Sequence, residues 1–285
     1  MSIPSGSENR IAGLFRNLAA HPAGAVGLAL VGLFLVAALL GPSLAPYDPT
    51  AQALKQSLQG PSAAHWLGTD ENGCDLLSEL LHGARLALII AGLTVTVSFT
   101  LGLFIGSAAG YLGGWVDEAV MRVVDLLLAF PGILLNLAVV ALVAKPTTGY
   151  LIFALCLNGW VGFARVARGQ ALAVKHQPFV LAAKAYGAGD GRILLRHIIP
   201  QLLAPMTIQA SFAFAGVVLT EASLSFLGLG PAHHYSWGSL LGQGTSYLWV
   251  THRMALTAGT AIAVVVLGFN LLGDAFQRAL DPMSR

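Results

Sequence analysis

The sequence predicts an all-α membrane protein whose chain crosses the bilayer six times. Apolar residues make up 56% of the 285 residues, charged residues make up only 10%, and the mean hydropathy is +0.74. Uncharged stretches that are long enough for the roughly 20 helical residues required by a bilayer core recur along the chain. The formal net charge of +2 is too small and too dispersed to indicate a nucleic-acid partner.

The first expected membrane element follows a polar N-terminal segment, residues 1–22, and is a transmembrane helix over residues 23–45. This run contains no charged residue, and it is longer than the roughly 7 to 15 apolar residues of a signal peptide. We therefore expect it to remain in the protein rather than to be cleaved. Residues 46–85 are polar and contain several prolines, which indicates an irregular loop on the periplasmic or extracellular side.

Residues 86–276 are expected to form a core of five further transmembrane helices. The apolar runs place these helices at about 86–112, 123–144, 147–164, 201–220 and 254–273. Pro131 is expected to kink the second of them, and Arg122 is expected to pair with Asp125 near a helix end.

The connection over residues 222–252 differs from the other segments because it is apolar but repeatedly interrupted. From 222 to 251 it contains no lysine, arginine, aspartate or glutamate, yet several glycines and a proline divide it. No uninterrupted spanning helix fits such a pattern, so we expect short helices or a re-entrant piece at the outer surface. Residues 277–285 are expected to form a tail on the inner side.

The central connection, residues 169–200, is the segment on which the functional prediction depends. Its second half is basic and broken by glycine, although the chain carries few charges elsewhere. Apolar spacing predicts two short helices on either side of a bend at Gly187, because glycine destabilises a helix by about 1 kcal/mol relative to alanine. Asp190 is expected to cap the second helix, and Pro200 is expected in the first turn of the next helix.

The central connection resembles the EAA loop in the membrane subunits of ATP-driven (ABC) importers. Two alanines, Gly187 and Pro200 follow one another at the spacing of the peptide and nickel branch of these permeases, and Leu181 replaces the glutamate that names the motif. The resemblance implies a type I importer permease (MetI-like) fold, in which this loop forms a coupling helix that docks on a cytoplasmic ATPase. The residues expected to make this contact are Ala182, Ala183, Gly187, Ala188, Gly189 and Asp190.

A second stretch, which reads HWLGTDENGCDLLSE from His65 to Glu79, is similar to the H-x-L-G-T-D-x-x-G-R-D-x-x-S-R box of the same branch. Cys74 and Glu79 occupy the two arginine positions. The spacing of its acidic residues lacks the terminal bidentate glutamate of a calcium loop, and we expect Asp75 near the start of a short helix. The receptor-docking residues expected in the outer loops are Asp70, Asp75, His233 and His234.

Two further stretches extend the resemblance to the C-terminal half. Residues 224–230 read LSFLGLG and are followed by Trp-Gly at 237–238, while FNLLGD at 269–274 precedes LDP at 280–282. These are similar to the L-S-F-L-G-L-G…W-G and F-N-x-x-G-D…L-D-P signatures of the branch, so the resemblance covers residues 24–282. The residues expected along the pathway or at its outer gate are Glu221, Ser225 and Phe226.

Lysine and arginine decide the orientation of a six-helix chain, whose two termini lie on the same side of the membrane. With both termini inside, eleven of the 15 lysines and arginines fall in inner segments and the other four in outer ones. We therefore expect cytoplasmic termini, a cytoplasmic central connection and a position in the bacterial inner membrane.

The chain lacks the phosphate-binding pattern G-x-x-x-x-G-K-[ST], since none of its lysines follows a glycine. We therefore expect a transport subunit rather than an enzyme, without a cofactor or metal of its own, and with ATP and Mg²⁺ bound by partner subunits. The resemblance implies a homologous permease as heterodimer partner, two cytoplasmic ATPase subunits and an external substrate-binding protein.

The predicted cargo is a di- or oligopeptide, with nickel or a metal chelate as the alternative. His233-His234 favours a metal, since imidazole is a suitable nickel ligand, but adjacent histidines in loops are commonly only solvated. A stand-alone secondary transporter is less favoured, because only Asp125 and Glu221 place charge near the spans, and both lie near span ends. A membrane enzyme is disfavoured because no nucleophile, histidine and acid are expected at one depth.

Overall fold

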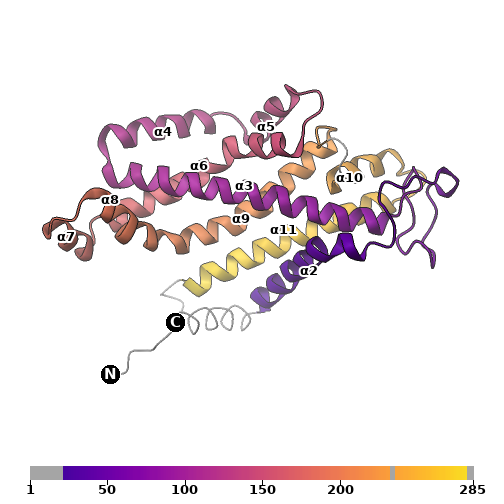
Figure 1. Ribbon diagram of the computed structural model, residues 1–285, viewed down its shortest axis with the longest axis horizontal. Helices are drawn as coiled ribbons and strands as arrows, with labels where there is room; N and C mark the ends of the chain where they lie inside the picture. The colour runs from indigo at the N-terminus through magenta and orange to yellow at the C-terminus, as the bar shows by residue number, and fades with distance from the viewer. Residues whose placement is uncertain (1–21, 232–234, 281–285) are drawn as a thin grey trace.

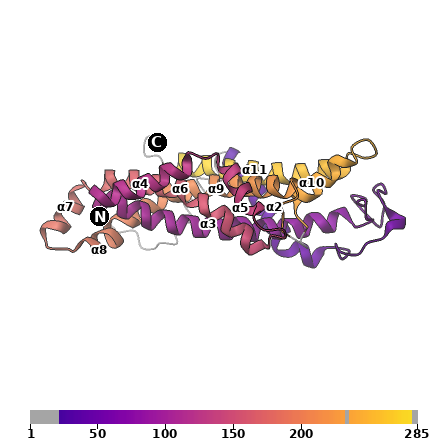
Figure 2. The same cartoon turned by 90° about the horizontal axis from the view of Figure 1, so that it is seen from above.

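The computed structural model describes residues 22–231 and 235–280, and it confirms the all-α fold class. Its long helices run roughly along one common axis, as the two views in Figure 1 and Figure 2 show. Within the described ranges, five helices are long and apolar enough to cross a membrane, and the number is six if a bent pair of shorter helices is counted as one span. The helices are α2 Pro22–Leu44, α3 Leu76–Leu112, α4 Gly114–Leu128, α5 Gly132–Ala141, α6 Thr148–Val174, α7 Pro178–Ala185, α8 Asp190–Ile193, α9 Ile199–Phe226, α10 Trp237–Ser246 and α11 Arg253–Leu280.

The helix start predicted near Asp75 is confirmed, but the short helix predicted there is continuous with the span predicted from residue 86, so that α3 begins at Leu76. Asp75 explains the early start, because its carboxylate accepts hydrogen bonds from both the backbone N–H and the hydroxyl of Ser78. The loop between α2 and α3 therefore ends at Asp75 and not at residue 85. Charged residues that suggested a loop, such as Glu79 and Arg85, lie on a helix that is longer than a bilayer core requires.

The helix predicted over residues 123–144 is broken at Pro131 rather than kinked. Helices α4 and α5 meet there at an angle of 79°, and Pro131 is the residue that precedes α5. Proline cannot continue α4 because it lacks an N–H and its ring collides with the preceding turn.

The prediction that Arg122 pairs with Asp125 on α4 is wrong. Arg122 Nη2 lies 2.7 Å from Glu118 Oε1, one turn earlier on the same helix, rather than beside Asp125. The stronger contact of this helix is made by Asp117, whose two carboxylate oxygens accept hydrogen bonds from the guanidinium of Arg168 on α6. This bidentate pair joins α4 to α6.

Helices α3 and α6 approach each other closely along a stripe of glycines on α3. A Cβ atom on Gly106 would lie 2.2 Å from the backbone oxygen of Ala164, and one on Gly102 would lie 2.3 Å from Cβ of Phe163. Gly110 continues the stripe one turn further. Small residues permit such backbone contact between helices in membranes, where close packing replaces the hydrophobic effect as the main source of association.

Helices α2, α9 and α11 pack around an aromatic cluster. The rings of Phe214 and Phe269 are stacked with centroids 4.0 Å apart, and Phe34 of α2 meets both of them edge to face. Trp237 of α10 completes the cluster and donates a hydrogen bond from its indole N–H to the carbonyl of Leu80 on α3. The cluster thus holds α10, and with it the connection 222–252 (the outer connection), against the bundle.

Two helices in the C-terminal half are longer than predicted. Helix α9 extends to Phe226 and α11 to Leu280, so Glu221 lies within α9 instead of at its end. Between them the short helix α10 begins after Ser236, which forms a capping box with Ser239. The central connection and the loop 45–75 lie at opposite ends of the bundle, and α10 lies at the same end as that loop (Figure 1).

Candidate functional site

The central connection folds as two short helices joined by a glycine bend. Helix α7 ends at Ala185, and Gly187 follows with a φ of +81°, a left-handed conformation that strains residues with a side chain. The N–H of Gly187 donates to the carbonyl of Lys184 and the N–H of Ala188 to that of Ala183, both at 3.0 Å. These bonds satisfy the last carbonyls of α7 and fix the direction in which the chain leaves it.

One face of the central connection is anchored in a buried core. Val180 and Ile193 are buried in one cluster with Ala171 of α6, and Ala183 and Ala188 pack against that cluster. Two of the residues expected to contact a partner, Ala183 and Ala188, therefore face the core of this chain.

The opposite face of the central connection is exposed and partly apolar. Tyr186 is 92% exposed and Leu181 is 53% exposed. Neither residue was predicted as a contact residue. For Leu181 a signal was available, because this apolar residue stands where the motif has a glutamate. The other expected contact residues are also exposed, namely Ala182, Gly187, Gly189 and Asp190.

Asp190 does not cap α8, contrary to the prediction. Gly189 occupies the cap position without a side-chain hydrogen bond, and Asp190 is the first residue of the helix. Its Oδ1 instead accepts a hydrogen bond of 2.7 Å from the hydroxyl of Tyr111, near the C-terminal end of α3. This bond fastens α8 to α3, beside a groove of about 310 Å³ that is lined in part by Lys175, His176 and Lys184.

A π-helical turn, Leu194–Ile198, joins α8 to α9. Pro200 supplies a physical reason, because a proline in a regular helix has no N–H and its ring collides with the carbonyl four residues earlier, here that of Arg196. A π turn widens the helix at this place and is found frequently at functional sites. The helical segment Asp190–Phe226 is continuous through the turn, so α8 and α9 form one element.

The loop 45–75 is held together by buried carboxylates. Asp75 Oδ1 lies 3.0 Å from His65 Nδ1 while its other oxygen caps α3. Asp70 Oδ1 accepts hydrogen bonds from the backbone N–H groups of Asn72 and Cys74, at 2.9 and 2.6 Å. The Asp75 carboxylate thus links two separated parts of the loop, whereas the Asp70 carboxylate stabilises a local turn.

The two receptor-docking residues predicted in this loop, Asp70 and Asp75, are buried inside it. Their carboxylates therefore shape the loop and do not form its outer surface. Trp66, in contrast, is exposed on the same loop. The other two predicted docking residues, His233 and His234, lie outside the described residues.

Within the described part of the chain, one group of side chains has the arrangement of a metal site. Asp70, Cys74 and Glu79 are all buried, and their potential ligand atoms lie within 4.8 Å of one another. Burial, followed by the negative charges of Asp70 and Glu79, raises the pKa of the Cys74 thiol to about 12. Sequence reasoning noted the unusual Cys74 and Glu79 but did not bring them together with Asp70.

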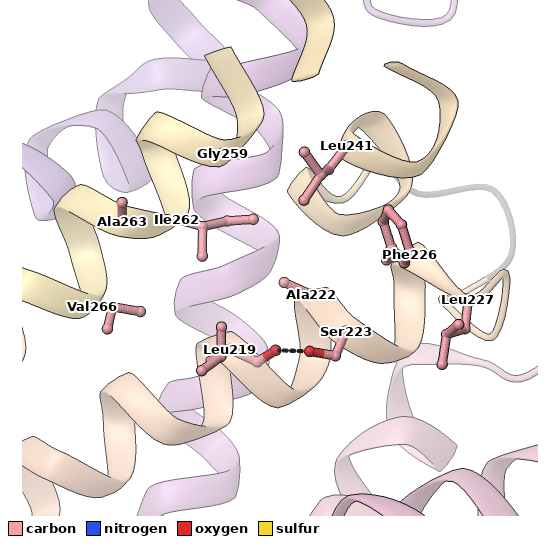
Figure 3. A pocket seen from close by; sticks show the side chains of 10 residues that line it. All are labelled: Leu219, Ala222, Ser223, Phe226, Leu227, Leu241, Gly259, Ile262, Ala263 and Val266. Atoms are coloured by element: carbon pink, nitrogen blue, oxygen red, sulfur yellow. Dashed lines mark hydrogen bonds between the residues drawn. The ribbon is translucent and has the colours of Figure 1, made fainter. Parts of the chain in front are cut away.

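The three predicted pathway residues do not converge on one site. Glu221 is only 3% exposed, and its carboxylate accepts a hydrogen bond of 2.7 Å from Ser225. Phe226 instead lines an apolar cavity of about 530 Å³ between α9, α10 and α11 (Figure 3). Ser223 also lines it, but its hydroxyl bonds the carbonyl of Leu219 on its own helix at 2.8 Å. The remaining lining residues are Ala222, Leu227, Leu241, Gly259, Ile262, Ala263 and Val266.

Comparison with known proteins identifies the family. Residues 102–285 match the family model of the binding-protein-dependent transport system inner membrane component, and residues 11–61 match the N-terminal transmembrane domain of oligopeptide transport permease C. The chain is 37% identical to the dipeptide transport system permease protein DppC of Alkalihalophilus pseudofirmus, over 94% of this chain and 88% of that protein.

Two other relatives have different cargoes in their names. The chain is 39% identical to the glutathione transport system permease protein GsiD of Pectobacterium atrosepticum, over 94% of this chain and 89% of that protein. It is 34% identical to the nickel transport system permease protein NikC of Escherichia coli, over 90% of this chain and 93% of that protein. With its apolar helices and its anchored central connection, the chain belongs to the family of inner membrane components of binding-protein-dependent (ABC) transport systems, in the peptide and nickel branch with the MetI-like fold.

Proposed function

We propose that this chain forms half of the translocation pathway of an ATP-driven importer of di- or oligopeptides, and that ATPase subunits act on it through the central connection. The observation that carries the proposal is the division of α7 and α8 into two faces. One face is anchored to α3 and α6, and the other exposes Leu181 and Tyr186. An exposed apolar surface on an anchored short helix is suited to a groove on a protein partner.

The proposed mechanism is rigid-body transmission. The hydrogen bond between Tyr111 and Asp190 and the buried face of α7 hold the central connection to the bundle. The continuous helical segment Asp190–Phe226 extends from that point to the residues around the apolar cavity at its other end. A displacement imposed by an ATPase therefore tilts α9, and alternating access follows as movement of helices about a fixed pathway.

The proposed assembly contains a homologous permease as heterodimer partner, two cytoplasmic ATPase subunits that bind ATP and Mg²⁺, and an external substrate-binding protein. We propose no cofactor for transport on this chain. The charge distribution supports cytoplasmic termini. The loop 45–75 and α10 lie at the end opposite to the central connection, which supports the loop around Asp70 and Asp75 as part of the receptor-docking surface, with Trp66 exposed on it.

Peptides are proposed as cargo because relatives named for dipeptides and oligopeptides match most of the chain. The measurement is titration of the cognate external binding protein with a panel of dipeptides and with nickel chelates. Saturable binding of a dipeptide supports the peptide proposal. Binding of a nickel chelate with no binding of any peptide would replace it with the nickel alternative.

The coupling role is tested with Tyr186→Ala. Truncation of an aromatic side chain at the centre of an interface costs more than about 1.4 kcal/mol, which corresponds to a tenfold weaker association. We expect retention of the ATPase by the detergent-solubilised complex to fall by about that factor. Folding should not change, since the side chain of Tyr186 contacts solvent in this chain.

Trp249→Ala is the matched control, because Trp249 is a fully exposed aromatic residue in the outer connection, at 100%. We expect this variant to retain the ATPase like the wild type. Equal retention in Tyr186→Ala and wild type would remove the exposed face of α7 from the interface and with it the proposed coupling route.

A further inference from the structure

A buried group of potential metal ligands lies apart from the coupling site and the pathway. Asp70 and Cys74 belong to the end of the loop 45–75, whereas Glu79 lies in the first turns of α3. Their potential ligand atoms are within 4.8 Å of one another, and each residue is no more than 2% exposed. Two backbone segments thus bring two carboxylates and a thiol together out of contact with water.

This group lacks a positive partner. Neither carboxylate oxygen of Glu79 has a hydrogen-bond partner, and no lysine or arginine in the described ranges forms an ion pair with Asp70 or Glu79. A buried carboxylate without hydrogen bonds or a counter-charge is strongly unfavourable. A cation that enters the group, or a proton shared by the two carboxyls, is therefore required.

The charge of the group favours a cation. With the thiol deprotonated, Asp70, Cys74 and Glu79 carry three negative charges at one place. A divalent ion that binds there neutralises two of them.

We propose that Asp70, Cys74 and Glu79 bind one divalent transition-metal ion of the zinc type. Zinc accepts thiolate and carboxylate ligands together, whereas calcium and magnesium take oxygen ligands alone. A tetrahedral zinc ion with metal–ligand bonds of 2.0 to 2.3 Å places its ligands roughly 3.4 to 3.7 Å apart. The ligand atoms, which lie within 4.8 Å of one another, move closer together to reach this geometry, and a metal ion deprotonates a coordinating thiol.

Such an ion has a structural role and is distinct from any transported metal. It links the end of the loop 45–75 to the first turns of α3, next to the cap formed by Asp75. The group is closed to solvent, which is typical of a retained ion and unlike a transport pathway. The proposal therefore does not depend on whether the cargo is a peptide or nickel.

The test measures bound metal on the full-length chain in detergent, purified with its partner subunits by a tag without histidines. After incubation with Zn²⁺ and gel filtration, elemental analysis should find about one zinc ion per chain. Cys74→Ser and Glu79→Gln should each lose most of it, and Cys156→Ser, which changes the other cysteine, should keep it. With Co²⁺ in place of zinc, thiolate-to-cobalt charge-transfer absorption should be present in Cys156→Ser and absent in Cys74→Ser.

The double variant Cys74→Arg/Glu79→Arg separates loss of the site from loss of the fold. It removes two of the three ligands and places two positive charges beside Asp70, so we expect normal elution, no bound zinc and no change of Tm on addition of a chelator. The chelator should lower the Tm of the wild type. Zinc content in the wild type no higher than in this double variant, or no cobalt–thiolate absorption in the wild type, would overturn the proposal in favour of a shared proton. Equal zinc content in Cys74→Ser and wild type would overturn it in favour of adventitious binding elsewhere.

Discussion

At the scale of single residues, the contact between Tyr111 and Asp190 connects the two parts of the proposed coupling machinery. The phenol donates to a carboxylate at 2.7 Å, and a hydrogen bond to a charged group contributes more than one between neutral groups. Asp190 belongs to the element that the ATPase is proposed to move, and Tyr111 belongs to α3. Loss of the hydroxyl should therefore weaken transmission without removing any apolar contact.

Tyr111→Phe tests this contact directly. The variant should lose about 1 kcal/mol of the interaction that holds α8 against α3, and substrate-stimulated ATP hydrolysis in a reconstituted complex should fall several-fold, with the Tm nearly unchanged. Tyr150→Phe is the matched control, because its hydroxyl bonds the carbonyl of Val139, away from the central connection. Wild-type stimulation in Tyr111→Phe would show that transmission does not use this bond.

Gly187, at the bend after α7, and Asp190, at the start of α8, show what the sequence can and cannot predict for single residues. Gly187 was predictable, because a glycine between two apolar helical patterns indicates a bend, and its φ of +81° requires that residue type. The partner of Asp190 was not predictable. A carboxylate at a helix start favours capping by local rules, and only the packing of α3 brings Tyr111 close enough to compete for it.

At the scale of elements, the glycine stripe on α3 determines how closely α3 and α6 pack. Gly102, Gly106 and Gly110 were not predicted to form a contact surface. Their spacing of four residues was visible, but their partners on α6 were not, because helix pairing is a property of the folded chain. Every one of the three would collide with α6 if it carried a Cβ.

Gly106→Ala should therefore destabilise the protein. The new Cβ would lie 2.2 Å from the carbonyl oxygen of Ala164, so the helices must separate, and overpacking of this kind costs about 1 to 3 kcal/mol. Gly92→Ala on the same helix is the control, since a Cβ there meets no atom within 4 Å. Thermal unfolding in detergent should give a lower Tm for Gly106→Ala only, and equal Tm values would contradict the contact.

Helix boundaries were the least predictable feature of the elements, and charge explains why. The spans predicted at 86–112, 201–220 and 254–273 stop next to Arg85, Glu221 and Asp274, whereas α3, α9 and α11 continue through these residues. On α9, a hydrogen bond from Ser225 accommodates the Glu221 carboxylate. The break at Pro131 is larger than expected because the chain turns by 79° there instead of bending a single helix.

At the scale of the whole molecule, the orientation in the membrane is the prediction with the widest consequences. Lys184→Cys in the central connection should react with a membrane-impermeant thiol reagent only after the inner membrane is opened. Lys55→Cys in the loop 45–75 should react while the inner membrane is intact, provided that the reagent can reach its outer face. The unsubstituted chain, with Cys74 and Cys156, supplies the background. Labelling of position 184 from outside would invert the topology and exclude the coupling role.

The fold class and the family were predictable from the sequence because both depend on local patterns, namely apolar run lengths and short motifs. The apolar cavity around Phe226 was not predictable, since α9, α10 and α11 each contribute part of its wall. The hydrogen bond between Glu221 and Ser225 was not predicted either, and their place on the pathway stays a prediction. Sites made by several helices require the packed structure.

Helix α3 extends without a break from Leu76 to Leu112, a length of about 55 Å at 1.5 Å per residue. Its first turns carry Glu79 beside the buried acidic group, and its last turn carries Tyr111 beside Asp190. One uninterrupted helix therefore joins the two ends of the bundle. The proposed receptor-docking loop and the proposed ATPase contact lie at its opposite ends, so a tilt of α3 would move both.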